Sequence, residues 1–190
     1  MSFEQIVKLP ADRVGALVGR NGKTKTHLEE QCGVTLTVDS KTGDVIIKLS
    51  QSIEESDPFK AVSIVNSIAK GFSPERAFKL LNDENMLGVI DLKEIVGKSR
   101  DAIRRIKGRI IGLNGKSRRL IEELTGADLS VYGYTASVIG NFEETKRAMN
   151  AIDKLAKGSP HNSVYKMLQR ARQKSKIERL QLWEDGKEFV

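Results

Sequence analysis

Two Gly-x-x-Gly turns, each followed directly by a lysine, could bind an anionic ligand. The first is GRNG at residues 19–22 with Lys23 behind it, and the second is GLNG at residues 112–115 with Lys116. Glycine adopts backbone conformations that a Cβ forbids, and it leaves no side chain to keep a ligand backbone away. Where such a turn enters a helix, free N–H groups and the helix dipole attract phosphate. The pattern predicts a clamp on a sugar-phosphate backbone, flanked by an apolar shelf for bases.

The two turns belong to an internal repeat. A shift of 93 positions aligns residues 18–38 with residues 111–131 and gives nine identities in 21 positions. Unrelated stretches of that length share roughly one or two identities on ordinary residue usage. A repeat of this period indicates two copies of one small domain.

Hydrophobic periodicity and turn residues predict the same order of elements, βααββα, in both copies. Residues 73–83 predict a connecting helix, and the insertion at 93–99 has no counterpart in the first copy. We expect an α+β protein with two modules at 1–83 and 84–158, followed by a basic helix and tail at 159–190. In the first copy the predicted elements are a strand at 4–10, helices at 11–19 and 23–31, strands at 34–39 and 45–50, and a helix at 57–72.

The basic residues of the chain are concentrated in its second half. Residues 1–83 carry 11 basic and 11 acidic side chains, residues 84–156 carry 13 and 10, and residues 157–190 carry 8 and 4. Such an asymmetry suggests a polyanionic partner, although a solvated basic surface would give the same counts.

The composition excludes several other classes of protein. No apolar run approaches the ~18 residues of a membrane span, and we expect neither a signal peptide nor a membrane anchor. The single cysteine, Cys32, excludes an internal disulfide and a cysteine-based zinc site. We expect a cytoplasmic protein without a metal or other cofactor.

The turn in its helical context resembles the KH domain of RNA-binding proteins. The stretches LVGRNGKTKTHLEEQCGVTLTV and RIIGLNGKSRRLIEELTGADLSV share its pattern of an aliphatic residue, Gly-x-x-Gly, a helix, a glycine and an alternating strand. The resemblance implies two tandem type I KH modules, each with a three-stranded antiparallel sheet that carries its helices on one face. In that family the turn clamps roughly four nucleotides of a single strand.

Three other interpretations of these residues are possible. A P-loop would require a glycine where Leu17 and Ile110 stand, and neither turn directly follows a strand. His27 and His161 lack the carboxylate or nucleophile neighbours of a catalytic site, so we expect no enzyme. The first turn could be a scaffold only, because its module carries no net charge.

The second copy is similar to the partner-of-Nob family of small-subunit ribosome-assembly factors. The similarity rests on the basic helix SRDAIRRIKGRIIG, the Gly-Lys-Ser after the turn, the connector GSPHNSVY and the basic helix after it. It implies a non-catalytic factor that binds pre-rRNA near the 3′ end of the small-subunit RNA, beside the endonuclease that trims it. The intact first turn favours an archaeal-type member. Two alternatives stay open: a protein-interaction scaffold of the assembling ribosome, and a regulatory or exosome-associated RNA-binding protein.

The C-terminal segment combines an apolar stripe with basic residues. Val164, Met167, Leu168 and Ala171 recur at helical spacing, and Ile177, Leu180 and Trp183 continue the stripe. This helix could pack on the second module, or it could extend the RNA contact or dock a protein. The predicted auxiliary arm is Lys166, Arg170, Arg172, Lys174 and Lys176.

These observations define a candidate RNA-binding site for single-stranded rRNA. The predicted principal clamp is Gly112, Leu113, Asn114, Gly115 and Lys116, with Arg105, Arg109, Arg118 and Arg119 on the flanking helices; the secondary clamp is Gly19, Arg20, Asn21, Gly22, Lys23 and Lys25.

Overall fold

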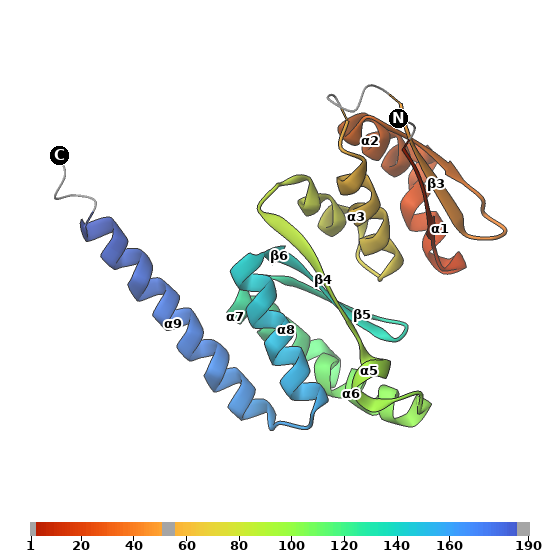
Figure 1. The fold of residues 1–190 in the computed structure, drawn as a ribbon. Helices are drawn as coiled ribbons and strands as arrows, with labels where there is room; N and C mark the ends of the chain where they lie inside the picture. The colour runs from red at the N-terminus through yellow and green to blue at the C-terminus, as the bar shows by residue number, and fades with distance from the viewer. Residues whose placement is uncertain (1–2, 51–55, 186–190) are drawn as a thin grey trace.

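The computed structural model describes residues 3–50 and 56–185, with side chains up to residue 178, as two packed modules and a long C-terminal helix (Figure 1). Both modules follow the order βααββα, so the predicted α+β fold of two tandem KH modules is confirmed. Each contains a three-stranded antiparallel sheet with its last strand in the middle, in the orders β1-β3-β2 and β4-β6-β5.

The first module begins with a strand and ends with an amphipathic helix that closes its core. Asp57 caps that helix by accepting a hydrogen bond from the Lys60 N–H at 3.0 Å, and Gly33 ends the second helix in a left-handed conformation. The elements are β1 (Glu4–Lys8), α1 (Ala11–Val18), the 3₁₀ turn η1 (Arg20–Gly22), α2 (Lys23–Cys32), β2 (Val34–Val38), β3 (Asp44–Leu49) and α3 (Pro58–Ala69).

The second module repeats this plan and adds a short helix at the predicted insertion. A capping box forms at Asn141 and Glu144, with each side chain bonded to the other residue's backbone N–H. The helix Arg100–Ile111 continues through Gly108 without a break. The elements are β4 (Asn85–Asp91), α5 (Leu92–Val96), α6 (Arg100–Ile111), the 3₁₀ turn η4 (Leu113–Gly115), α7 (Lys116–Thr125), β5 (Asp128–Tyr132), β6 (Thr135–Asn141) and α8 (Phe142–Ala156).

The predicted connecting helix is two short pieces, α4 (Pro74–Ala77) and η3 (Phe78–Leu81). The first module and this connection lie over the outer face of the second module's sheet (Figure 1). Ile139 on β6 is buried in the first module's core, and Leu87 on β4 packs against that core. The outer face of the first module's own sheet is open, as the 61% exposure of Ile6 shows.

The C-terminal helix α9 (His161–Asp185) runs along the second module. Val164 and Leu168 are each 1% exposed and belong to the core of that module, so the interpretation as a packed helix holds for its first half. The start of α9 therefore shares the core of the second module. Farther on, Ile177 is 55% exposed, and the predicted stripe positions Leu180 and Trp183 lie outside the described side chains. No helix in the described residues is long and apolar enough to cross a membrane.

Candidate nucleic-acid interface

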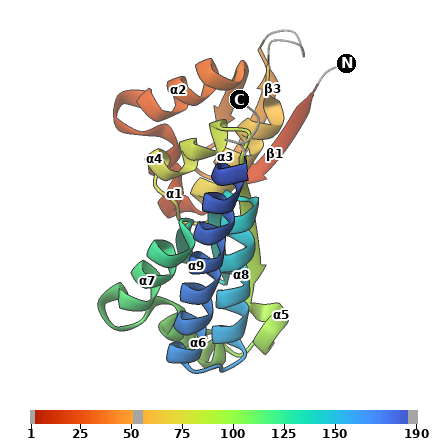
Figure 2. The ribbon, with the colours of Figure 1, turned by 90° about the vertical axis from the view of Figure 1, so that its left-hand side faces the viewer.

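The two Gly-x-x-Gly turns have nearly the same backbone. Gly19 and Gly112 have φ/ψ values of 73°/176° and 72°/174°. Asn21 and Asn114 are left-handed, with φ/ψ values of 55°/32° and 51°/29°. Asparagine tolerates this region better than most residues because its side chain can bond locally. Figure 2 shows both helix-turn-helix corners on the same side of the molecule, at the left of the view.

The two glycines of each turn serve different purposes. A Cβ at Gly112 would lie 2.8 Å from the backbone nitrogen of Ser117, so the first glycine lets the two helices approach each other closely. A Cβ at Gly22 or Gly115 would meet nothing within 4 Å, although both residues have a positive φ. The second glycine therefore leaves open space at a helix N-terminus, where a ligand backbone can approach the N–H groups.

The second clamp is braced and surrounded by basic side chains. Arg119 Nη2 donates to the carbonyl oxygen of Asn114 at 2.9 Å, which fixes the turn from the following helix. Leu113 is 84% exposed at the tip, and Lys116 is exposed at the start of α7. The turn and Lys116 therefore form one accessible surface, and Arg105 is exposed farther back on α6.

Arg109 does not join that surface. Its Nε donates to the carbonyl oxygen of Leu155 at 3.0 Å, and its Nη2 donates to that of Ser159 at 2.6 Å. Both carbonyls lie at the end of α8, so Arg109 ties α6 to the connection between α8 and α9. We correct its predicted role from phosphate contact to positioning of this joint.

The first clamp has the same form with fewer free charges. Arg20 and Lys23 are exposed at the turn, but Lys25 pairs with Glu29 at 3.7 Å. Arg13 donates from α1 to the carbonyl of Ile68 in the last turn of α3 and to that of Phe72 just after it. Arg109 makes the equivalent contacts in the second module. The predicted secondary site has the same turn, and Arg20 and Lys23 form no ion pair with the side chains that the structure describes.

A glutamate on the second clamp helix anchors the edge strand of its module. Glu122 Oε1 accepts from the Leu129 N–H at 2.9 Å, as Glu29 accepts from the Leu36 N–H at 2.7 Å in the first module. Only Glu122 is also bound by the connecting segment, through Arg76 Nη1 at 2.7 Å.

Further contacts join the first module to β5, the edge strand of the second. Ser130 Oγ donates to the carbonyl oxygen of Lys70 at 2.9 Å, and the Tyr132 hydroxyl donates to both carboxylate oxygens of Asp12 at 2.7 and 2.8 Å. Partial burial, followed by the Asp12 contact, raises the pKa of Tyr132. A Cβ at Gly71 would lie 2.7 Å from that of Tyr132, so only glycine permits this approach.

The predicted basic arm lies on the exposed side of α9. Lys166, Arg170, Arg172, Lys174 and Lys176 are all exposed. Lys174 pairs with Glu178 at 3.7 Å, and the arm is otherwise available for an anionic strand.

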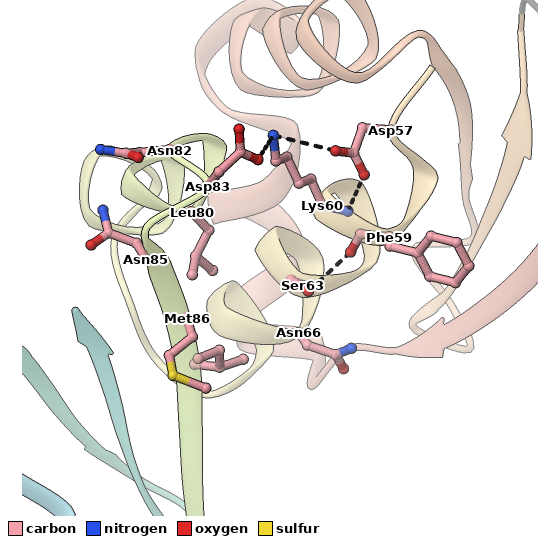
Figure 3. A pocket seen from close by; sticks show the side chains of 11 residues that line it. Asp57, Phe59, Lys60, Ser63, Asn66, Leu80, Asn82, Asp83, Asn85 and Met86 are labelled. Atoms are coloured by element: carbon pink, nitrogen blue, oxygen red, sulfur yellow. Dashed lines mark hydrogen bonds and ion pairs between the residues drawn. The ribbon is translucent and has the colours of Figure 1, made fainter. Parts of the chain in front are cut away.

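A hollow lies between α3 and the connection to β4 (Figure 3). It has a volume of about 410 Å³, and Lys60 Nζ pairs there with Asp83 at 2.6 Å and Asp57 at 3.3 Å. Because two carboxylates outnumber one ammonium group at its centre, this hollow is acidic and does not attract a phosphate.

The histidines occupy structural positions. The His27 ring packs edge-on against Phe78 at 4.8 Å between centroids, and His161 Nε2 lies 2.8 Å from the carbonyl oxygen of Arg109. Within residues 3–50 and 56–185, no group of three or more His, Cys, Asp or Glu side chains could hold a metal ion.

Comparison with protein families gives two matches in the order of the modules. Residues 4–57 match the KH domain family, and residues 86–173 match the PNO1 second-domain family, described as a eukaryotic-type KH domain of type I. The second match extends into α9, in agreement with the burial of Val164 and Leu168.

Relatives and solved structures match nearly the whole chain. The KH domain-containing protein MJ0443 of Methanocaldococcus jannaschii is 44% identical over 94% of this chain and 78% of that protein. The pre-rRNA-processing protein pno1 of Schizosaccharomyces pombe is 25% identical over 90% of this chain and 71% of that protein. The crystal structure of Dim2p from Pyrococcus horikoshii is 45% identical, with a TM-score of 0.80 over 88% of this chain and 99% of that one. A second structure, an a/eIF2alpha-aDim2p-rRNA complex from the same organism, is 44% identical, with a TM-score of 0.84 over 91% of this chain and 96% of that one.

Proposed function

The chain belongs to the partner-of-Nob family of tandem KH proteins, whose members include PNO1 and Dim2p, and from that premise we propose that it binds single-stranded small-subunit rRNA during ribosome assembly. The observation that carries the proposal is the second clamp: a preformed turn with open space at Gly115 and basic side chains around it. The similar Dim2p of Pyrococcus horikoshii in a complex with rRNA supports the choice of RNA.

The clamp binds the sugar-phosphate backbone and leaves the bases to the groove beside it. Phosphate oxygens approach the turn at the N-terminus of α7, where the helix dipole and Lys116 supply positive charge. The bases then face the space between the clamp helices and the edge strand β5. Phosphate contacts fix the register of the strand, and the groove reads the bases.

We further propose that the bound segment lies near the 3′ end of the small-subunit rRNA. There the protein would work beside the endonuclease that trims this end, as a cytoplasmic binding factor without a catalytic step of its own. The fission yeast relative is named as a pre-rRNA-processing protein, which supports a role in the processing of rRNA.

A scaffold for protein partners is the second candidate function. It is favoured by the open outer face of the first module's sheet, where Ile6 is 61% exposed, and by the presence of a/eIF2alpha in the complex of the similar Dim2p. A scaffold would join an assembling subunit even when its clamps could not bind RNA.

The test is the double variant Leu113→Asp with Asn114→Asp, which places two carboxylates at the phosphate site and keeps both glycines. A carboxylate 4 Å from a phosphate costs roughly 1 kcal/mol in bulk water and roughly 4 kcal/mol near a protein surface. We therefore expect affinity for a single-stranded 3′ rRNA segment to fall on the order of a hundredfold, with an unchanged thermal midpoint. Unchanged affinity would overturn the clamp assignment, and retained association with assembling subunits would favour the scaffold.

A further inference from the structure

A small pocket lies where the connecting segment meets the second module. It has a volume of about 200 Å³ and is lined by residues 71–73 and Arg76 on one side, and by Arg118, Leu129 and Ser130 on the other. Arg118 stands on the clamp helix α7, two residues beyond Lys116, and Leu129 and Ser130 stand on the edge strand. The pocket is therefore next to the predicted path of the strand, and half of its wall comes from outside the second module.

The two arginines of this pocket approach the same carboxylate from different modules. Arg76 Nη1 lies 2.7 Å from Glu122 Oε1, whereas Arg118 Nε lies 3.8 Å from Glu122 Oε2. Arg118 Nε is buried and has no hydrogen-bond partner among the described residues. A buried donor of this kind requires a partner, because leaving it unpaired costs the desolvation of the group.

The charges around the pocket nearly cancel. Arg76 is also 3.7 Å from Asp128, and Lys79 pairs with Asp128 at 2.5 Å. Three basic side chains thus share two carboxylates, which leaves about one positive charge. A phosphate group gains little from such a site, whereas a neutral group with hydrogen-bond acceptors can still use the guanidinium donors.

The geometry points to a base-binding pocket built by both modules: we propose that it holds one base of the bound RNA, with two neighbouring acceptors facing Arg118 and Arg76. Guanine offers such a pair in O6 and N7, which arginine binds through two parallel hydrogen bonds. Gly71, which has no side chain, and the edge strand at Leu129 and Ser130 complete the wall of the pocket. The first module thus contributes to RNA recognition through its connecting segment, independently of its own clamp.

This inference rests on the proposed RNA binding and deepens it. Since the pocket follows Lys116 along α7, the base it holds belongs to a nucleotide next to those on the clamp. Recognition at that position depends on the packing of the two modules, whereas recognition at the clamp does not.

The test pairs a change in the protein with a change in the RNA. The probe is a short single strand from the 3′ end of the small-subunit rRNA, together with versions that lack one base at a time and keep every phosphate. With the natural protein we expect one missing base beside the clamp positions to weaken binding on the order of tenfold. The Arg76→Gln variant should bind the intact strand about as weakly as the natural protein binds the strand that lacks this base. Loss of the base should weaken the variant no further, because the two changes remove the same contact.

Two matched variants separate base recognition from stability of the junction. Lys79→Gln removes an ion pair with the same Asp128 but does not line the pocket, so it should bind every strand like the natural protein. Arg76→Lys keeps a positive charge beside Glu122 and loses the planar fork, so it should show the same base-specific loss as Arg76→Gln.

The outcomes are distinct. Equal weakening of all strands by Arg76→Gln and Lys79→Gln would show a junction effect and overturn the pocket. A smaller dependence of binding on salt in Arg76→Gln, without selectivity for one base, would show a phosphate contact and overturn it as well. If the natural protein binds the strand and the Leu113→Asp with Asn114→Asp variant does not, the proposed function survives either result.

Discussion

The turn at 19–22 and the turn at 112–115 can be compared position by position, because their backbone angles differ by only a few degrees at the first glycine and the asparagine. Their surroundings differ. The second turn is braced by Arg119, whereas the corresponding position in the repeat, Thr26, has no guanidinium to offer. The module around the first turn is neutral, and the module around the second is basic.

The two sheets also differ in how far their outer faces are covered. The outer face of the second sheet is covered by the first module, so that Ser137 is fully buried there. The outer face of the first sheet is open. A repeated sequence has therefore produced the same local structure twice, while the packing between the copies has given the two turns different surroundings. The backbone is the same in both turns, so the proposed ranking of a principal and a secondary site rests on the neighbouring residues alone.

The largest expected effect concerns α9, the helix that packs on the second module. Leu168→Ala removes a side chain that is 1% exposed in the second core, and truncation of a buried leucine costs about 2 to 5 kcal/mol. Chemical denaturation should show this loss. Arg170→Ala, on the exposed side of the same helix, should stay within about 0.5 kcal/mol of the natural protein. Equal losses in the free energy of unfolding for the two variants would show that α9 does not belong to the core.

The next effect compares the two clamps directly. Arg20→Asp with Asn21→Asp places the same two carboxylates at the first turn. We expect its affinity for a single-stranded 3′ rRNA segment to fall less than tenfold, against on the order of a hundredfold for the corresponding pair in the second turn. Fluorescence anisotropy at one fixed salt concentration is sufficient to rank them. A larger loss at the first turn would reverse the assignment of principal and secondary site.

The sequence predicts the parts of this comparison that are local. Three such features are present: Gly-x-x-Gly followed by a helix, Gly33 at a helix end and the Asn141 capping box. Each depends on residues within about one turn of each other. The insertion at 93–99 is visible in the sequence as a gap in the repeat, but its helical conformation is not.

The features that the sequence does not predict depend on contacts between distant residues. Arg109 is one of several arginines on α6, and nothing in its spacing shows that it reaches Leu155 and Ser159. The pocket beside Arg118 is completed by Arg76, 42 positions earlier. Nothing in the sequence around Lys70 and Gly71 indicates that they contact the edge strand. These contacts can be identified only once the packing of the modules is known.

Alanine substitutions at Gly22 and Gly115 can distinguish the effect of backbone strain on stability from the effect of a lost ligand contact on binding. Both have a positive φ, and a Cβ at either position would point into open space, so an alanine there should cost about 1 to 2 kcal/mol of stability through strain alone. Because the new methyl group at Gly115 enters the space where the strand approaches, Gly115→Ala should weaken RNA binding about tenfold. Gly22→Ala should do so less. Thermal midpoints and RNA affinities should be measured for both variants. Equal losses of affinity would contradict the ranking of the clamps.

Cys32 and Thr125 occupy the same position in the two copies, and they predict a difference in pH dependence. Burial, followed by the nearby Asp57, raises the pKa of the Cys32 thiol to about 11. Above pH 9 the unfolded chain loses this proton while the folded chain keeps it, so stability should fall as the pH rises from 9 to 11. At pH 10 the loss should be about 1 kcal/mol. Cys32→Thr, which copies the second module, should lack this component in denaturation measurements at pH 8 and 10; an identical decline in both proteins would exclude the thiol as its source.

The smallest effect concerns the basic arm, which has no equivalent in the first module. Deleting the whole helix would also remove Val164 and Leu168 from the core, so single exposed residues are the better probe. Arg170→Gln removes one charge without touching that core. If Arg170 contacts a phosphate of the strand, the slope of log K against log salt should flatten by roughly 0.7. Because a phosphate contact carries no sequence information, the affinity for every single-stranded RNA tested should fall by a similar small factor. Lys157→Gln is a suitable control, since Lys157 already pairs with Asp153 at 2.8 Å. An unchanged slope for Arg170→Gln, or a loss confined to one RNA sequence, would mean that the arm does not follow the strand and that RNA recognition ends at the second module.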